Sequence, residues 1–237
     1  SLFTYFLIVG GYFFKKNKIF SIFSFLIFLF PIIISKINIL ENDDFLYKTN
    51  VRLVQPNINQ SDKWDPSKFK ENIKNLVELS VSNNYKNFDL VIWPETAIPY
   101  NIEEKNLKKI FDDAQFKEIK EINNLITGAV RLEKNSNDVE IYNSIFLIND
   151  KFRNIISHDK IKLVPFGEYI PLRYFLKNNL ALSGIDFSQG EKVNIFDLDN
   201  IKILPLICYE VIFPHITFGK NEKFNLLINI TNDAWYG

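Results

Sequence analysis

The apolar N-terminal stretch is the feature that most constrains how this chain can fold. Residues 19–35 form a run of 17 residues without a charge, made of Ile, Phe, Leu and Ser with one Pro. About 20 apolar residues suffice for a helix to cross a bilayer, and this run approaches that length with its flanking residues. Residues 1–14 are also uncharged but shorter. We therefore predict a transmembrane hairpin over residues 1–36, with an incomplete first helix.

The loop between the two apolar segments is basic, with Lys15, Lys16 and Lys18. Positive loops tend to stay on the cytoplasmic side, so everything after Lys36 is expected on the opposite, extracytoplasmic side. Residues 37–49 form a connector, and residues 50–237 form the second domain. The chain contains no Met and starts with Ser, so we expect it to be a piece of a longer protein.

The charge balance and the rare residue types exclude several classes of function. Lys plus Arg and Asp plus Glu both total 28, so no overall positive field favours nucleic acid as a partner. A single Cys excludes an internal disulfide framework and a cysteine-based zinc site. His158 and His215 lie far apart in the sequence. We expect no metal and no cofactor.

From residue 50 onward, short apolar runs alternate with amphipathic stretches. Phe69, Ile73, Val77 and Val81 recur every four residues, which gives one helix an apolar face. Strands are predicted at 51–55, 89–93, 125–131, 141–148, 152–156, 193–196, 201–207 and 226–230, and helices at 65–81, 103–119 and 211–218. Strands that alternate with helices early on, with a hairpin in the middle, indicate an α/β sandwich.

Polar or reactive groups follow several of these strands. Cys208, the only cysteine, comes directly after an apolar run, but a lone cysteine is more often a core residue than a nucleophile. It becomes a candidate when a base and an orienting group lie elsewhere in the chain. Glu95, Lys160 and Glu168 offer these groups, although each also has an ordinary interpretation: a helix-terminal carboxylate, a surface lysine and a solvated glutamate.

This set of residue types suits acyl transfer through cysteine. A carboxylate such as Glu95 can remove the thiol proton and later return one. The fixed charge of Lys160 favours the thiolate and can stabilise the oxyanion of each tetrahedral intermediate.

The order of these motifs resembles a known signature. Trp93-Pro94-Glu95, then Lys160 with Leu163-Val164-Pro165-Phe166-Gly167-Glu168, then Cys208-Tyr209-Glu210 resemble the Glu-Lys-Cys signature of the nitrilase superfamily. The similarity is closer to its membrane-bound branch, the apolipoprotein N-acyltransferases. It extends over about residues 51–237 and includes Gln55-Pro56-Asn57, Thr127-Gly128-Ala129, Tyr142-Asn143-Ser144, Asp186-Phe187-Ser188-Gln189-Gly190 and Thr231-Asn232-Asp233-Ala234-Trp235-Tyr236-Gly237.

The resemblance implies a fold, a reaction and a location. The fold is a nitrilase-like α-β-β-α sandwich preceded by transmembrane helices, in a multi-pass, monomeric protein of the bacterial inner membrane. The reaction moves an acyl chain from a phospholipid to Cys208, as a thioester, and then to the N-terminal amine of diacylglyceryl-cysteine in a lipoprotein. The family pattern makes Glu95, Lys160 and Cys208 catalytic.

The resemblance also gives roles to neighbouring residues. Glu168 is expected to support the lysine, Glu210 to position a loop, and Tyr209 and Trp93 to line the acyl path. His158 stands where the family usually has Tyr, which leaves the packing of that ring open. The family continues beyond both ends of this chain, so the fragment can carry the complete trio and still be inactive alone.

Two other functions remain open at this point. One is a carbon-nitrogen hydrolase, an amidase or nitrilase in which water resolves the thioester of a small amide substrate. The other is a membrane-tethered binding module without catalysis. Residues 172–182, rich in Leu, Phe and Tyr with two basic residues, suit either an interfacial arm or a helix packed on the core.

Overall fold

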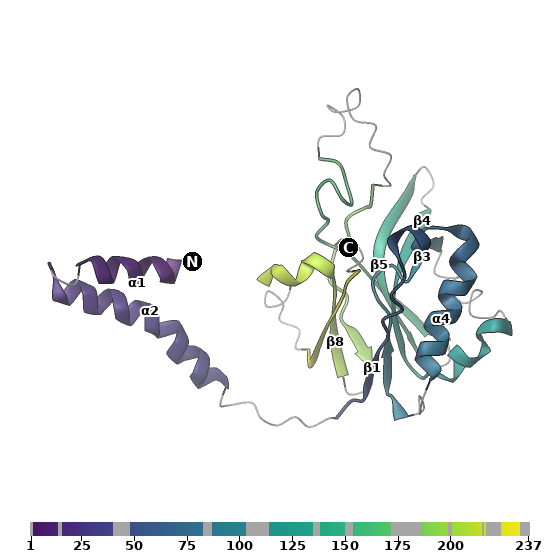
Figure 1. Cartoon of the computed structure of the whole chain (residues 1–237), viewed down its shortest axis with the longest axis horizontal. Coiled ribbons are helices and arrows are strands. Elements are labelled where there is room, and N and C mark those ends of the chain that lie inside the picture. Colours follow the sequence, from purple (N-terminus) through teal and green to yellow (C-terminus); the bar gives the residue numbers. More distant parts are fainter. Residues whose placement is uncertain are drawn as a thin grey trace. The chain divides into compact units, whose positions relative to one another are not determined.

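The computed structural model describes residues 2–13, 16–39, 48–82, 87–102, 114–134, 138–149, 154–171, 186–198, 201–214, 216 and 224–232. It divides into two compact units, Ser1–Lys48 and Thr49–Gly237 (Figure 1). The segment 172–182, with both interpretations of its role, lies outside the described residues. Each unit is considered by itself below.

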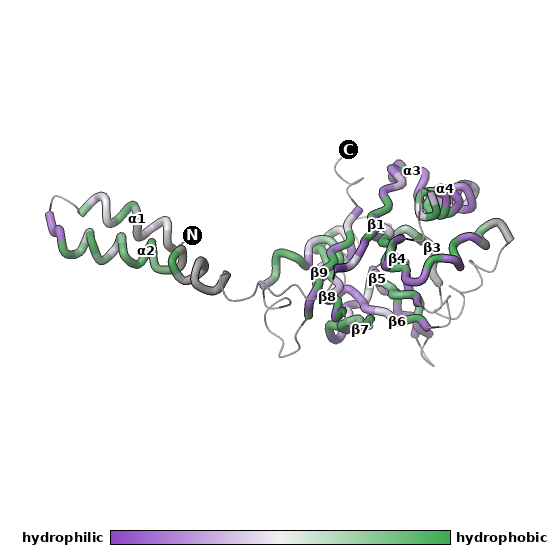
Figure 2. Tube along the Cα trace, turned by 90° about the horizontal axis from the view of Figure 1, so that it is seen from below, coloured by the Kyte–Doolittle hydropathy of each residue, from purple (hydrophilic) through white to green (hydrophobic). Residues whose placement is uncertain are grey.

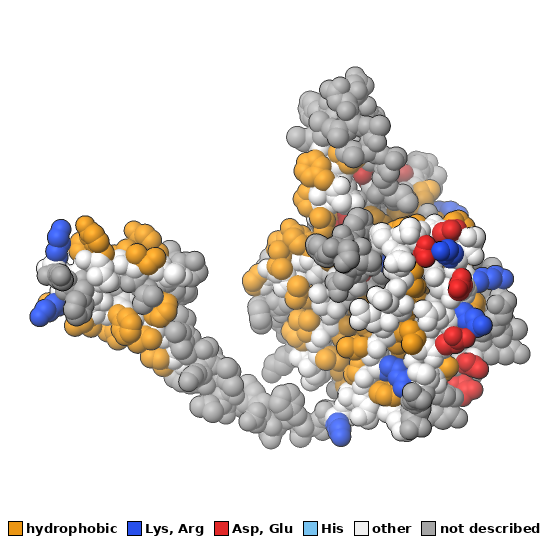
Figure 3. All heavy atoms as spheres, in the orientation of Figure 1, with side chains coloured by type: hydrophobic (Ala, Val, Ile, Leu, Met, Phe, Trp, Pro, Cys, Tyr) orange, Lys and Arg blue, Asp and Glu red, His pale blue; other side chains and the backbone are white. Residues whose placement is uncertain are grey.

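The first unit is a pair of helices, α1 (Leu2–Phe13) and α2 (Lys18–Ile39). Small residues let them pack closely: the Ser21 hydroxyl donates to the Gly10 main-chain oxygen at 2.6 Å, and a Cβ on Gly10 would lie 3.1 Å from Ser24 Cβ. Both helices are largely hydrophobic along their described length (Figure 2). Large apolar side chains face outward on both of them (Figure 3), including Tyr5, Ile8, Tyr12, Ile19, Ile22, Phe23 and Phe30.

The predicted helix pair is therefore present at the expected position. Among the residues described, however, no helix is both long and apolar enough to cross a membrane. The transmembrane assignment of the pair is not confirmed.

A six-stranded mixed sheet forms the centre of the second unit. Its order is β1-β2-β4-β5-β6, and β3 also pairs with β4. The β1, β2 and β3 pairings are parallel, whereas β4, β5 and β6 pair antiparallel. The strands are β1 (Val51–Leu53), β2 (Leu90–Ile92), β3 (Ile98–Ile102), β4 (Leu125–Lys134), β5 (Val139–Asn149) and β6 (Asn154–Asp159).

Helix α4 (Phe69–Val81) covers one face of this sheet (Figure 1). Asp65 caps the preceding 3-10 turn, η1 (Pro66–Lys68), by accepting a hydrogen bond from the Ser67 N–H, and a short helix, α3 (Gln60–Lys63), comes before it. The expected apolar face of α4 packs in the core with Val91 and Trp93. The opposite face of α4 carries charged side chains (Figure 3), as an amphipathic helix should.

A second, three-stranded sheet packs on the other face of the large sheet. It contains β7 (Phe196–Leu198), β8 (Ile201–Ile207) and β9 (Leu226–Ile230) in that order, with β8 and β9 parallel. Apolar side chains from both sheets form the core between them, among them Ile92, Ile126 and Ile145 on one side and Ile203 and Ile207 on the other. The two sheets and α4 confirm the predicted α/β sandwich.

The outer face of the small sheet is also apolar. Val193, Leu204, Leu206 and Ile216 form a third cluster there, against which Phe213 packs. The 3-10 turn η4 (Cys208–Ile212) leads from β8 to this region. The outer face of the small sheet is therefore covered by the apolar side chains of this third cluster.

Several predicted boundaries were wrong. β3 was missed because its Pro99 interrupts a strand pattern; Pro is confined to edges and bulges, and the β3 register does shift. The predicted strand at 193–196 is observed as β7, which only begins at Phe196. Of the predicted helix at 211–218, residues 211 and 212 end the 3-10 turn η4, Phe213 is extended, and residues 215, 217 and 218 lie outside the described part. Of the predicted helix at 103–119, residues 103–113 lie outside the described part, and η3 (Ala114–Glu121) is a 3-10 helix kinked at Phe116.

β2 and β3 both pair with the same edge of β4, and the turn between them contains Glu95. Ile92 pairs with Ile126 and Ile98 with Ala129, so the turn lies opposite Gly128. A Cβ on Gly128 would lie 2.5 Å from the Thr96 nitrogen and 2.7 Å from Glu95 Cα. Real Cβ atoms do not approach backbone so closely, and only glycine fits there.

Gly128→Ala should therefore destabilise the second unit by about 1–3 kcal/mol, the range for overpacking a tight site. The free energy of unfolding from denaturant titration measures this. Gly167→Ala is the control, because its new Cβ would meet only Val164 atoms at 3.5 Å or more, and we expect a change within about 0.5 kcal/mol. Equal effects of the two substitutions would contradict the prediction.

Candidate active site

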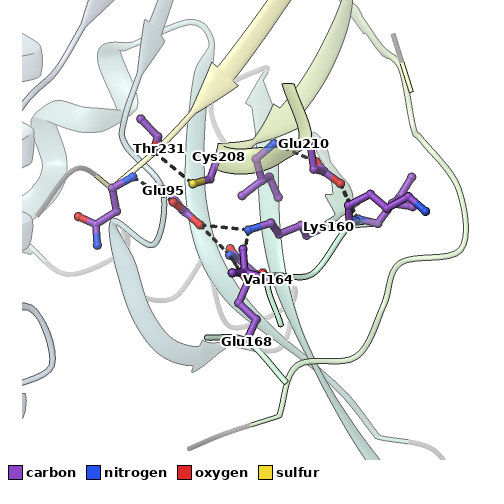
Figure 4. A network of polar contacts seen from close by, with 12 residues as sticks. Glu95, Lys160, Val164, Glu168, Cys208, Glu210 and Thr231 are labelled. Atoms are coloured by element: carbon purple, nitrogen blue, oxygen red, sulfur yellow. Dashed lines mark hydrogen bonds and ion pairs between the residues drawn. The ribbon is translucent and has the colours of Figure 1, made fainter. Parts of the chain in front are cut away.

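Three strand ends bring Glu95, Lys160 and Cys208 together in the second unit (Figure 4). Glu95 follows β2, Lys160 follows β6, and Cys208 follows β8. β2 and β6 belong to the large sheet and β8 to the small one. Residues that are 113 positions apart in the sequence thus meet where the two sheets pack together.

The Lys160 ammonium lies at the centre of this group and is almost fully buried, with 1% of the residue exposed. Its Nζ lies 2.8 Å from Glu168 Oε1 and 3.9 Å from Glu95 Oε1. A buried charge is tolerated only when it is paired and hydrogen-bonded. The surface interpretation of this lysine is therefore wrong.

The side-chain amide of Asn143, in the middle of β5, connects the two carboxylates. Its Nδ2 donates to Glu95 Oε1 and to Glu168 Oε1, both at 2.8 Å. The second oxygen of Glu95, Oε2, accepts from the Asn232 N–H at 3.0 Å. Both oxygens of the Glu95 carboxylate are thus held by donors from distant parts of the sequence.

A tight turn after Lys160 presents Glu168. Its Oε2 accepts the Val164 N–H at 2.8 Å, while its main-chain oxygen accepts the Phe187 N–H at 2.8 Å. The bond from Val164 holds the carboxylate against the lysine (Figure 4), and the bond from Phe187 holds the backbone that carries it. Glu168 is a half-buried partner of Lys160, with 13% of its side chain exposed, and not a fully solvated surface group.

Cys208 begins η4 with a left-handed backbone, φ 53°. The side chain is partly exposed, and the Thr231 hydroxyl donates to its Sγ at 3.5 Å. In Figure 4 the sulfur points toward the Glu95 carboxylate. The thiol is thus presented at a sharp strand-to-turn junction with an acidic group and a buried cation beside it.

Backbone strain is concentrated at this site. Among the described residues other than glycine, four have positive φ: Asn57, Thr96, Phe166 and Cys208. Thr96 follows Glu95, and Phe166 lies two residues before Glu168. Such conformations cost about 1–3 kcal/mol each and persist only where the surroundings enforce them, often at functional sites.

Glu210 is fully buried and joins the two strand ends that carry Lys160 and Cys208. Its Oε1 accepts the Ile161 N–H at 2.6 Å and the Lys162 N–H at 3.1 Å, and its Oε2 accepts the Ile207 N–H at 2.9 Å. Burial by itself raises the pKa of a carboxyl group. His158 and the N–H donors of Ile207 and Ile161 outweigh burial and hold the pKa of Glu210 below its usual value.

His158, which departs from the family pattern, is completely buried behind the site. Its Nε2 lies 3.8 Å from Glu210 Oε2, which is too long for a hydrogen bond, and its Nδ1 accepts the Asn194 N–H at 3.4 Å. The ring therefore packs beside the Glu210 carboxylate, where its presence helps to lower the pKa of that group.

The two aromatic residues predicted to line an acyl path lie in different surroundings. Trp93 is fully buried, and its indole N–H donates to the Ser80 hydroxyl of α4 at 2.8 Å. Tyr209 is partly exposed, with its ring edge-on to Phe213 at 5.0 Å. Their proposed role remains a prediction.

A cavity of about 490 Å³ lies next to the site. Thr231 and Asn232 border it, and these residues contact Cys208 and Glu95. Lys63 also borders it, although only 7% of that residue is exposed. The remaining wall is rich in side-chain amides, from Gln55, Asn57, Asn59, Gln60, Asn72 and Asn229. Within the described residues, no group of three or more His, Cys, Asp or Glu side chains could hold a metal ion.

Sequence reasoning gave no role to four residues that contact the trio: Lys63, Asn143, Thr231 and Asn232. Three of them lie in motifs that carried the family resemblance. Asn143 offered the clearest signal, because an amide within a long apolar strand must find buried partners. Lys63 offered none, because a lysine near a helix end reads as a surface residue.

The arrangement agrees with comparisons to known proteins. A family model described as carbon-nitrogen hydrolase matches residues 50–237. The chain belongs to the carbon-nitrogen hydrolase family. Its curated relatives include the apolipoprotein N-acyltransferase of Rickettsia prowazekii, 35% identical over 229 residues, which cover 94% of this chain and 45% of that protein. The apolipoprotein N-acyltransferase of Rhizobium rhizogenes is 40% identical over 202 residues, or 79% of this chain and 37% of that protein.

The chain thus spans less than half the length of these curated relatives. Among solved structures, an E41Q mutant of the amidase from Nesterenkonia sp. AN1 superimposes with a TM-score of 0.51. That match has 14% sequence identity and covers 76% of this chain and 64% of the amidase. It shows the same fold in the second unit.

Asn143→Asp tests how much the Asn143 amide stabilises the Glu95 and Glu168 carboxylates. The change replaces a donor shared by Glu95 and Glu168 with a third acidic group of the same shape. An uncompensated buried charge costs about 3–5 kcal/mol, so we expect a loss of that order in the free energy of unfolding at pH 7. The neighbouring carboxylates raise the pKa of the new group, so the loss should shrink as pH falls.

Asn75→Asp is the control for this experiment. It makes the same chemical change, but Asn75 donates only to the Pro56 main-chain oxygen at 3.3 Å. A loss for Asn143→Asp that did not exceed the control, or that stayed constant between pH 7 and pH 4, would contradict the proposed arrangement.

Glu210→Gln tests the buried clamp. The carboxylate accepts three N–H groups, and an amide would turn its NH₂ toward some of them, at a cost of about 1–3 kcal/mol. Because the folded pKa is lowered from 4.5, ionised Glu210 stabilises the fold above about pH 4.5, and this contribution disappears as pH falls through the folded value. Denaturation of wild type and variant across pH should therefore show curves that converge in acid. A difference in the free energy of unfolding between wild type and Glu210→Gln that widened in acid would contradict this prediction. The control is Glu133→Gln, a substitution of an exposed glutamate.

Proposed function

We propose that this chain carries the nucleophile, base and cation of an apolipoprotein N-acyltransferase. The observation that carries the proposal is the buried Lys160 ammonium, held by Glu168 and Glu95 beside the chain's only thiol. The names of the curated relatives support the acyl-transfer reaction. Glu95 would act as the base, Lys160 as the oxyanion partner and Cys208 as the acyl carrier.

The first half-reaction forms a thioester. The Glu95 carboxylate takes the Sγ proton of Cys208, and the thiolate attacks the ester carbonyl carbon of a phospholipid. The Lys160 ammonium stabilises the oxyanion of the tetrahedral intermediate. When the intermediate collapses, the C–O bond breaks, the lysophospholipid alkoxide takes the proton from Glu95, and the acyl chain stays on sulfur.

The second half-reaction transfers the acyl chain to an amine. The N-terminal amine of a diacylglyceryl-cysteine attacks the thioester carbonyl, and Glu95 accepts the amine proton. The C–S bond then breaks, an amide forms, and the thiolate of Cys208 recovers a proton from Glu95. Lys160 stabilises the oxyanion of this intermediate as well, so one constellation serves both steps.

Both substrates of this reaction lie in a membrane, so the site must be kept close to one. The outward-facing apolar side chains of α1 and α2 support a role for the first unit in membrane attachment. We propose that the protein is a multi-pass protein of the bacterial inner membrane with the second unit on the extracytoplasmic side. A monomeric state remains a prediction.

The central test is acylation of Cys208. Full-length protein incubated with phospholipid should gain one acyl chain on Cys208, detectable by peptide mass spectrometry, and lose it when a diacylglyceryl-peptide is added. Lys160→Ala should slow acylation about 100- to 1000-fold, as expected for loss of an oxyanion donor. Lys202→Ala, an exposed lysine 4.0 Å from Asp197, is the matched control and should leave the rate unchanged.

Two outcomes would reject the proposal. A folded Cys208→Ala variant that still acylated the peptide would remove the thioester mechanism. Release of ammonia from small amides at rates typical of enzymes, without acyl transfer to the peptide, would favour a carbon-nitrogen hydrolase in which water resolves the thioester.

A further inference from the structure

Lys63 is a buried lysine next to the site to which the mechanism above gives no task. It ends α3, and its Nζ donates a hydrogen bond to the Glu95 main-chain oxygen at 2.9 Å. Burial lowers the pKa of Lys63 to about 8, although the nearby charge of Glu95 acts in the opposite direction. Keeping an ammonium group in such surroundings is costly, so its contact with Glu95 calls for an explanation.

The oxygen that Lys63 binds belongs to a turn under strain. Thr96, the next residue, has φ 51°, a conformation that persists only where contacts enforce it. On the other side of the turn, the Gly128 N–H donates to the Pro94 oxygen at 3.2 Å. The backbone of β4 and the Lys63 ammonium therefore contact this turn at neighbouring peptide groups.

The position of this turn sets the position of the Glu95 carboxylate. Glu95 Oε1 must meet Asn143 at 2.8 Å, and Oε2 must meet the Asn232 N–H at 3.0 Å. A hydrogen bond from a charged donor is about twice as strong as a neutral one, and a shift of about 1 Å in a reacting group can cost about 100-fold in rate. A charged donor on the main chain of the base is thus well suited to fix its geometry.

Two other roles for Lys63 fit the structure less well. A lysine that only stabilised the fold would have no reason to donate its hydrogen bond to Glu95, the proposed base, in particular. A lysine that served to bind an anion in the neighbouring cavity would not need its Nζ to donate to the Glu95 main-chain oxygen, as it does at 2.9 Å.

We propose that Lys63 is a positioning residue for Glu95: its ammonium holds the strained Glu95–Thr96 turn so that the carboxylate can take the proton of Cys208. This inference rests on the proposed role of Glu95 as the base. It assigns to Lys63 an effect on thiolate formation that acts entirely through Glu95.

The alkylation rate of Cys208 by iodoacetamide, followed by peptide mass spectrometry in the full-length protein, tests this without any acyl substrate. Glu95→Gln should slow alkylation because the base is lost. Lys63→Met, which keeps the length of the side chain, should slow it about 10- to 100-fold. The double variant Lys63→Met/Glu95→Gln should be no slower than Glu95→Gln alone, because residues that act through one another are not additive.

Two further variants separate positioning from general stability. Lys63→Arg keeps a charged donor, and the adjoining cavity has room for the larger head, so it should recover most of the wild-type rate. Lys68→Met removes a lysine that pairs with Asp62 on the surface and should alkylate at the wild-type rate. If thermal denaturation shows that Lys63→Met does not fold, Lys63→Gln, which keeps a neutral donor, takes its place and should alkylate more slowly than wild type.

The outcomes distinguish this inference from the proposed function. Wild-type alkylation in Glu95→Gln would overturn the role of Glu95 and the inference together. Slow alkylation in Glu95→Gln with a normal rate in Lys63→Met would overturn the inference alone, and so would additive effects in the double variant or a Lys63→Arg variant as slow as Lys63→Met. In acyl-transfer assays, Lys63→Met should lower kcat for thioester formation and leave the KM for phospholipid unchanged.

Discussion

The buried ammonium of Lys160 is the interaction on which the rest of the site depends. A cation so far from water requires anionic partners, and it has two, Glu168 at 2.8 Å and Glu95 at 3.9 Å. Two carboxylates around one cation leave an excess of negative charge, which Asn143 and the Asn232 N–H offset with hydrogen bonds. A group of this kind can accept one proton without creating a new isolated charge, which is what a base beside a thiol requires.

The scaffold fixes this group through backbone geometry more than through side-chain packing. β2 and β3 share one edge of β4, and the break between them places the Glu95 turn directly against Gly128. Cys208 leaves β8 with a left-handed backbone that presents its sulfur at the junction of the two sheets. The strain at the Glu95 turn is maintained because β2 and β3 on either side of it are both paired to β4, and that at Cys208 because this residue begins η4 directly after β8.

Much of this arrangement could be predicted because the main site residues follow apolar strands, and both strand ends and motif order are visible in a sequence. The contacts of Asn143 and Lys63 could not be predicted. Asn143 lies within a strand, where its partners depend on which strands become neighbours, and Lys63 is buried only because a distant turn folds against it. The same limit explains β3: its pairing with β4 depends on the Glu95 turn and not on a local apolar pattern.

Glu210 shows how one side chain can join two halves of a site. Its carboxylate accepts N–H groups from Ile161 and Lys162, directly after Lys160, and from Ile207, directly before Cys208. The first pair continues from the large sheet and the last belongs to the small one, so this carboxylate ties the sheets together at the point where the two groups must meet. Because Glu210 lies only two residues after Cys208 in the chain, a movement of Cys208 is transmitted to the backbone next to Lys160. The distance between thiol and cation is therefore governed by a buried hydrogen-bonded clamp, and the packing of the two sheets alone need not maintain it.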